Sequence, residues 1–170
     1  VGAGVEAIWT GAFPTYSPAY YASDFAQQFV RDWYGSVYLY PWGWDSPGNE
    51  LVRTVMTEAG VERALDYYGE GFVEAQMMEQ VLRAAYASGD MTQAGVLAAK
   101  STISNLDFGG LAPAETYVGT PNEQVQRQSI IYKPSLEDIG AGGSGTVVVE
   151  PNYIGSLVEN FDFQDACFLI

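Results

Sequence analysis

The side chains best suited to acid–base chemistry in this sequence are its carboxylates. Glu70 and Glu74 lie four residues apart, so on a helix they would share one face. Such a pair could act as the acid and base of a glycosidase. The chain has 21 acidic and 7 basic residues, however, and an acidic chain produces such pairs on solvated helix faces by chance. The solvated face is the simpler interpretation, and hydrolysis remains the alternative.

Histidine is absent, and its absence removes several kinds of site. Ser-His-Asp and Cys-His catalysis need an imidazole, which is also the commonest metal ligand. The single cysteine, Cys167, makes a structural zinc site improbable. It is expected to be either a buried thiol or one half of a disulfide whose partner lies outside these residues. We therefore expect no catalytic residue, no cofactor and no metal.

Two glycine-containing motifs resemble parts of nucleotide-binding sites but lack residues that those sites require. DFGG at 107–110 matches the magnesium-binding triplet of protein kinases, but the catalytic-loop histidine is missing. GAGGSG at 140–145 lacks the lysine of a phosphate-binding loop. The first motif predicts a turn whose glycines take positive φ angles, and the second predicts a flexible linker.

The aromatic side chains indicate a binding site more clearly than the carboxylates or the glycine-containing motifs do. The sequence PWGW at 41–44 places two tryptophans in a loop directly after the alternating run SVYLY. Surface loops concentrate binding residues, and Trp combines an apolar face with a hydrogen-bonding edge. The candidates for ligand contact are Phe13, Tyr16, Trp42, Trp44 and Tyr68, and Trp44 is equally compatible with packing on the helix that follows.

Strands and helices alternate along the first half of the chain. A buried strand is expected at 5–10 and another at 36–40, and Asp45 or Ser46 is expected to cap a helix that ends before Gly60. This alternation favours an α/β fold with a parallel sheet, in which ligands bind beyond the carboxyl ends of the strands. The other expected elements are helices at 19–25, 61–88 and 92–103, a helical turn at 25–33, a turn at 105–110, and strands at 114–118, 128–133 and 147–150.

The net charge of −14 narrows the range of partners. Phosphate backbones need Lys and Arg, so no nucleic acid is expected, and an anionic membrane surface is disfavoured for the same reason. There is no apolar run of about 18 residues, which a membrane span requires. The charge would keep a secreted or periplasmic protein soluble.

Whole segments of the chain resemble, in order, the C-terminal half of the type I periplasmic solute-binding proteins that serve branched-chain amino acid ABC transporters. The resemblance covers about residues 5–134, and its segments are IWTGAFPTYSPAYY, YGSVYLYPWGWDSPGNELVRTVMTEAG, DYYGEGFVEAQMMEQVLRAAYASGDMTQAGVLAAKSTISNLDFGGLAP and VQRQSIIYKP. It implies two Rossmann-like α/β lobes joined by a hinge, of which this chain is an incomplete C-terminal portion. The missing N-terminal half of the same protein is then an expected partner.

The resemblance also implies a division of the chain. Residues 1–64 would belong to the second lobe, 65–120 would cross into the first lobe, and 121–170 would return as strands, linker and tail. The hinge would lie at Tyr67, Gly69 and Gly71, where the two glycines independently predict a bend.

The implied function is that of an extracytoplasmic substrate-binding component of an ABC importer, not an enzyme, with a permease as partner. It would be periplasmic, or a cell-surface lipoprotein in a Gram-positive bacterium, and would bind a small amino-acid-like or aromatic or amide solute by closing its lobes. In the amino-acid binders the loop after the first strand offers a carboxylate to the ligand. Residues 12–16 contain no acid here, which favours a less polar ligand stacked on Tyr16 and Trp42. The alternatives are a ligand-sensing module of the same fold and a hydrolase that uses Glu70.

Overall fold

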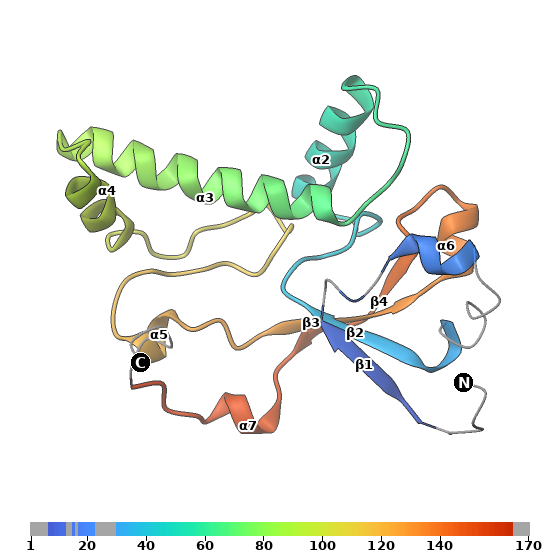
Figure 1. The fold of residues 1–170 in the computed structure, drawn as a ribbon. Coiled ribbons are helices and arrows are strands. Elements are labelled where there is room, and N and C mark those ends of the chain that lie inside the picture. The colour runs from blue at the N-terminus through green and yellow to red at the C-terminus, as the bar shows by residue number, and fades with distance from the viewer. Residues whose placement is uncertain (1–6, 13–14, 16, 23–29, 165–170) are drawn as a thin grey trace.

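The computed structural model describes residues 7–12, 15, 17–22 and 30–164 of the 170-residue chain. Within them, a four-stranded sheet lies beside a group of helices (Figure 1). The strands are β1 (Trp9–Ala12), β2 (Trp33–Val37), β3 (Ser129–Pro134) and β4 (Thr146–Tyr153). The helices are η2 (Pro18–Ala22), α2 (Pro47–Glu58), α3 (Tyr67–Ser88), α4 (Gln93–Lys100), α5 (Pro121–Gln124), α6 (Leu136–Gly140) and α7 (Ser156–Glu159).

The sheet is mixed, with the order β1-β2-β3-β4. Only β1 and β2 are parallel, and the other two pairings are antiparallel. The predicted parallel sheet is therefore confirmed for one pair and wrong for the others. The segment 135–145 between β3 and β4 is short, and a short connection lets neighbouring strands run antiparallel.

The first two strands differ from the sequence prediction in position and burial. β1 was expected to be buried, but Trp9 is exposed because β1 forms the edge of the sheet. β2 begins at Trp33, within a stretch expected to be helical. The ring of Trp33 packs edge-on against that of Tyr132 in β3, with centroids 5.5 Å apart, and Gly35 faces the Tyr132 ring so closely that a Cβ there would lie 2.4 Å from it. Residues 30–32 are helical as expected, and of the described residues in the expected turn only Trp33 joins the strand, where it packs on Tyr132.

The caps of α2, the end of α3 and the start of α4 confirm the predicted positions, whereas α4 ends at Lys100, before the expected residue 103. The Ser46 side chain accepts a hydrogen bond from the Asn49 N–H at 3.2 Å, and Thr92 caps α4 in the same way. Gly60 and Gly89 follow α2 and α3 with φ angles of +74° and +78°, the left-handed conformation that ends many helices.

Residues 61–71 differ from the expected helix with a bend. Residues 61–66 are not helical, and α3 begins at Tyr67. Gly69 and Gly71 lie inside the continuous α3 helix. The region expected as a strand at 114–118 makes only an isolated bridge, between Leu106 and Glu115.

The two glycine-containing motifs are both ordered turns. At 107–110 the Gly109 N–H donates to the Asp107 carboxylate at 2.9 Å, which confirms the predicted turn. A flexible linker or loop was expected at 139–146, and residues 141–145 form a loop between α6 and β4. The Gly145 N–H donates to the Asp138 carboxylate at 2.7 Å, and Ser144 is buried, so side-chain contacts hold this segment in place.

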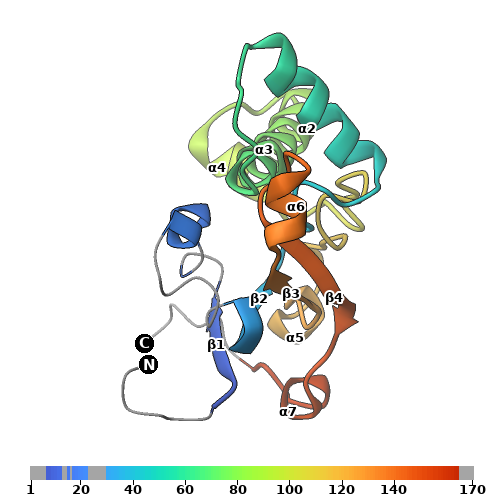
Figure 2. The same ribbon diagram turned by 90° about the vertical axis from the view of Figure 1, so that its right-hand side faces the viewer.

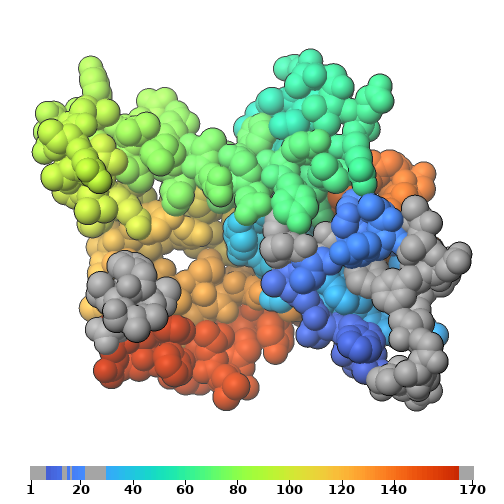
Figure 3. Space-filling model, in the orientation of Figure 1, coloured from blue at the N-terminus to red at the C-terminus, as the bar shows by residue number. Residues whose placement is uncertain are grey.

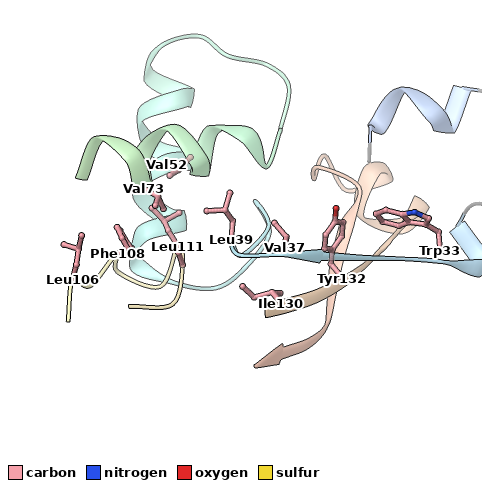
Figure 4. Close-up of a cluster of buried hydrophobic side chains, with 11 residues drawn as sticks. Trp33, Val37, Leu39, Val52, Val73, Leu106, Phe108, Leu111, Ile130 and Tyr132 are labelled. Atoms are coloured by element: carbon pink, nitrogen blue, oxygen red, sulfur yellow. The ribbon is translucent and has the colours of Figure 1, made fainter. Parts of the chain in front are cut away.

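One hydrophobic core joins the helices to the sheet. Figure 2 shows α2, α3 and α4 gathered beyond one end of the strands. Leu39 follows β2 and is buried between the two groups of side chains in Figure 4. The next residue, Tyr40, donates its N–H to the Leu111 carbonyl at 2.8 Å. The core residues are Val52, Val73, Leu106, Phe108, Leu111 and Ala112 on the helical side and Trp33, Val37, Leu39, Ile130 and Tyr132 on the sheet side.

The contact between α2 and the 107–110 turn leads to a first prediction. A Cβ at Gly48 would lie 2.7 Å from both the Leu111 side chain and the Phe108 carbonyl oxygen. We expect Gly48→Ala to lower the free energy of unfolding in urea by about 1–3 kcal/mol through overpacking. The matched control is Gly71→Ala in α3, where a Cβ meets nothing within 4 Å, and which should raise stability by about 0.5–1 kcal/mol. Equal effects of the two changes would contradict the packing described.

Candidate functional site

The PWGW loop lies beyond the carboxyl end of β2, as predicted, and its backbone is held from two sides. The Trp42 N–H donates to the Asp66 carboxylate at 2.7 Å. The Arg53 guanidinium of α2 donates to the Trp42 carbonyl at 2.6 Å and to the Trp44 carbonyl at 3.2 Å. The Asp66 carboxylate, as acceptor, and the Arg53 guanidinium, as donor, thus hold the peptide groups on either side of Trp42.

The two tryptophan rings of the loop have different neighbours. Trp42 meets Tyr68 of α3 edge-on, with centroids 6.1 Å apart and an interplanar angle of 64°. Trp44 instead stacks on Tyr40 at 4.8 Å and 15°, and the Tyr40 hydroxyl donates to the Pro151 carbonyl of β4 at 3.1 Å. All four rings are half-buried. The structure therefore brings Trp42 and Tyr68 together and places Trp44 in a separate stack.

Asp66 is the buried polar centre of this region, with 9% of its surface exposed. Besides the Trp42 N–H, its carboxylate accepts a hydrogen bond from the Thr146 hydroxyl at 2.7 Å and another from Ser144. We call these four residues the Asp66 clasp. Because Asp66 directly precedes α3 and Thr146 begins β4, the clasp ties the helices to the sheet.

Burial raises the pKa of Asp66 above its ordinary value, and the nearby charge of Asp138 acts in the same direction. The hydrogen bonds from Ser144, Trp42 and Thr146 oppose this effect without cancelling it. A carboxylate in a site of low dielectric is costly unless donors surround it. Burial of the Asp66 carboxylate therefore requires the hydrogen-bond donors of the clasp.

Tyrosines from several elements come close to the clasp. Tyr21 of η2 donates its hydroxyl to the Gly145 carbonyl at 2.9 Å. Burial raises the pKa of Tyr132 in β3, and the charges of Asp66 and Tyr67 raise it further. Aromatic faces and hydroxyl groups suit non-covalent recognition. In the described part of the chain, no group of His, Cys, Asp and Glu side chains could hold a metal ion.

The other residues predicted for the site have mixed outcomes. Phe13 and Tyr16 lie outside the described residues. Tyr67 is exposed, Gly69 is buried and Gly71 is exposed, all at the start of α3. Nothing in these positions tests the predicted hinge.

Sequence reasoning did not single out Asp66, Arg53 or Thr146. Asp66 carries one available signal, because it directly precedes the aromatic pair Tyr67-Tyr68 at the start of a helix. Its hydrogen-bond donors, however, lie in the PWGW loop and in β4, far along the chain. Arg53 and Thr146 carry no local signal of their own.

Glu70, the candidate catalytic acid, is engaged by a tyrosine. The Tyr38 hydroxyl donates to the Glu70 carboxylate at 2.6 Å. Burial, followed by this hydrogen bond and the charges of Glu70, Glu74 and Glu115, raises the pKa of Tyr38. Glu74 is exposed. Glu74 thus matches the solvated helix face that was the simpler interpretation, whereas Glu70 is half-buried and bonded to Tyr38.

Two solved structures share this arrangement of elements. The fatty acid ABC transporter substrate-binding protein from Thermomonospora curvata matches with a TM-score of 0.76 and 21% identity, over 89% of this chain and 38% of its own. A branched-chain amino acid ABC transporter protein from Thermus thermophilus, with bound valine, matches with a TM-score of 0.67 and 19% identity, over 93% of this chain and 42% of its own. The chain has part of the type I periplasmic-binding-protein fold.

This type I fold confirms the fold class predicted from the sequence. The chain spans less than half the length of each matched protein. No protein-family model and no curated protein matches the sequence. Among the helices that the structure describes, none combines the length and the apolar character that a membrane crossing requires.

The Asp66 clasp leads to a second prediction. Asp66→Ala removes the acceptor of the Trp42 N–H and of the Thr146 hydroxyl, and each buried donor left without a partner costs about 1–3 kcal/mol. We expect the free energy of unfolding in urea to fall by about 2–4 kcal/mol. Asp45→Ala, a change at an exposed acid in the same loop, should have little effect. Equal losses of unfolding free energy in the two variants would show that the clasp contributes nothing to stability.

The pH dependence of the clasp is a third prediction. The folded carboxyl of Asp66 binds its proton more tightly than the unfolded one, whose pKa is near 3.8. Stability from this group is therefore present at low pH and is lost as pH rises through the folded pKa. The free energy of unfolding of the wild-type chain minus that of Asp66→Asn should fall as pH rises above about 4. Urea titrations of both proteins measure this difference, and a difference that grows with pH would mean that the pKa is lowered.

Proposed function

We propose that this chain is part of the extracytoplasmic substrate-binding component of an ABC importer and is not an enzyme. The match to the substrate-binding protein of a fatty acid ABC transporter, with a TM-score of 0.76, carries this proposal. Binding by lobe closure needs no covalent chemistry, so the absence of histidine is no obstacle. A permease and the remaining half of a two-lobe protein are the proposed partners.

The proposed ligand site lies beyond the carboxyl ends of β1 and β2. These strands are parallel, so their carboxyl ends meet at the same edge of the sheet, where open α/β sheets bind ligands. The residues assigned to the ligand are Phe13, Tyr16, Trp42, Trp44 and Tyr68. Trp42 and Tyr68 are the best supported of these, because their half-buried rings touch and the Trp42 backbone is held on both sides.

The proposed ligand is a small amino-acid-like or aromatic or amide solute with an apolar body. The two matched proteins are described with a fatty acid and with valine, which share a carboxylate on an apolar chain. Arg53 is the cation nearest in sequence to the loop tryptophans, and it is already bonded to their carbonyls. A carboxylate on the ligand would therefore find its partner in the opposing lobe.

The proposed lobe division is residues 1–64, 65–120 and 121–170. In Figure 1, α3 and α4 lie together away from the strands, and the chain then returns to the sheet as β3 and β4. We assign the hinge to Tyr67, Gly69 and Gly71, since two glycines in one turn lower the cost of local distortion.

A ligand-sensing module of the same fold is the second candidate function. It would use the same cleft and the same closure, and a neighbouring permease gene would favour the importer. For a hydrolase that uses Glu70, the described residues offer no supporting observation, since Tyr38 occupies that carboxylate.

A thermal-shift screen of the complete two-lobe protein tests the importer proposal. The library holds amino acids, aromatic acids, small amides and fatty acids. A ligand at 100 times its Kd should stabilise the protein by about 2.7 kcal/mol. Trp42→Ala should abolish this shift while the unliganded protein stays folded. Trp9→Ala, at an exposed ring on β1, is the matched control and should keep the shift.

Two results would contradict the proposal in different ways. Indifference of the protein to the whole library would remove the support for solute binding. A Trp42→Ala protein that unfolds without ligand, while Trp9→Ala does not, would place Trp42 in the core and leave the ligand to other residues.

A further inference from the structure

The two carboxylate oxygens of Asp66 meet different kinds of donor. Oδ1 accepts from the backbone N–H of Trp42 at 2.7 Å, and Oδ2 accepts from the Thr146 hydroxyl, also at 2.7 Å. A backbone N–H can only donate, whereas a hydroxyl can turn and accept. The Ser144 and Thr146 hydroxyl oxygens lie 3.0 Å apart, so either can serve the other as donor or acceptor. A proton on Asp66 can therefore be accommodated at Oδ2 and not at Oδ1.

Protonation of Asp66 at Oδ2 would weaken the hydrogen bond at Oδ1. A hydrogen bond to an ionised acceptor is roughly twice as strong as one to a neutral acceptor. The Trp42 N–H would keep its partner without this charge assistance, while the Trp42 carbonyl would stay bonded to Arg53. One of the two peptide groups that flank Trp42 would thus be held less firmly.

This peptide group lies where the helices meet the sheet. In Figure 3 the segment that follows β2 (cyan) is visible between α3 (green) and the chain that returns to the sheet (orange). The Trp42 ring meets that of Tyr68 edge-on, with centroids 6.1 Å apart. Asp66 is bonded to the backbone of Trp42 and not to its ring. The carboxylate therefore acts on the ring pair through the position of the peptide group.

Titratable and charged groups surround Asp66 from several elements. The charge of Asp138 in α6 acts on it directly, and burial raises its pKa above the ordinary value. Tyr132 of β3 is in turn affected by the charges of Asp66 and of Tyr67 in α3. Arg53 of α2 is bonded to the carbonyls of the PWGW loop. Asp66→Asn removes one proton site and leaves the other groups in place, so it isolates the titration of Asp66.

We propose that Asp66 is a positioning residue of the ligand site: its ionised carboxylate holds Trp42 in the orientation that the ligand meets, and its protonation weakens ligand binding. This inference rests on the function proposed for the PWGW loop and adds a regulation to it. Ligand affinity would fall as pH falls through the folded pKa of Asp66.

Calorimetric measurement of Kd in the complete two-lobe protein tests this role. The probes are valine, phenylacetate, benzamide and octanoate, each titrated from about pH 8 to about pH 4. Asp66→Asn keeps an acceptor for the Trp42 N–H but has no proton to gain, whereas Asp66→Ala has no acceptor. Val81→Ala is the control for lowered stability, because Val81 is buried in α3 and is not part of the clasp.

The expected results separate positioning from stability. At about pH 8, Asp66→Ala should raise Kd about tenfold, because the loop must then be ordered by the ligand. Val81→Ala should leave Kd within about twofold of wild type at the same pH. The wild-type protein should bind about threefold more tightly than Asp66→Asn at about pH 8 and equally at about pH 4. The ratio of the two Kd values cancels any titration of the probe itself.

Two results would overturn the positioning role while solute binding stands. One is a ratio of wild-type to Asp66→Asn Kd values that stays constant with pH, a measurement that decides the matter even where Asp66→Ala does not fold. The other is an equal loss of affinity in Asp66→Ala and Val81→Ala. A wild-type protein that binds none of the four probes at any pH would instead overturn the proposed function, and this inference with it.

Discussion

The arrangement of the helices relative to the sheet depends on the hydrogen bonds of the buried Asp66 carboxylate. This carboxylate accepts hydrogen bonds from the loop after β2 and from the start of β4, and Asp66 itself directly precedes α3. A buried acid must be surrounded by donors, so the three segments are held at one point. Leu39 and the other core side chains supply apolar contact across the same junction, but apolar contact has no direction. The hydrogen bonds of the clasp give the junction its geometry.

The role proposed for the aromatic loop in ligand binding is compatible with the same constraint. Large rings in a free loop would collapse onto any nearby apolar surface. Here the Trp42 peptide is bonded to Asp66 on its N–H side and to Arg53 on its carbonyl side, which leaves the ring to meet Tyr68 in one orientation. A binding surface that is already ordered loses less conformational entropy when a ligand binds. The clasp also couples the loop to α3, so movement of the helices relative to the sheet would be transmitted to Trp42.

Most helix ends and the early alternation of strands and helices could be predicted from the sequence by itself, because short-range sterics and hydrogen bonds decide them. Ser46 and Thr92 cap helices, Gly60 and Gly89 end them, and the 107–110 turn forms as expected. The order of whole segments was sufficient to predict the type I fold. Only the tertiary structure decided the antiparallel half of the sheet and the start of β2 at Trp33, along with the ordering of the 140–145 segment and the Asp66 clasp. Each of these features depends on a contact between residues that are distant in sequence, such as Trp33 with Tyr132 and Asp66 with Thr146. Local sequence carries no information about such contacts.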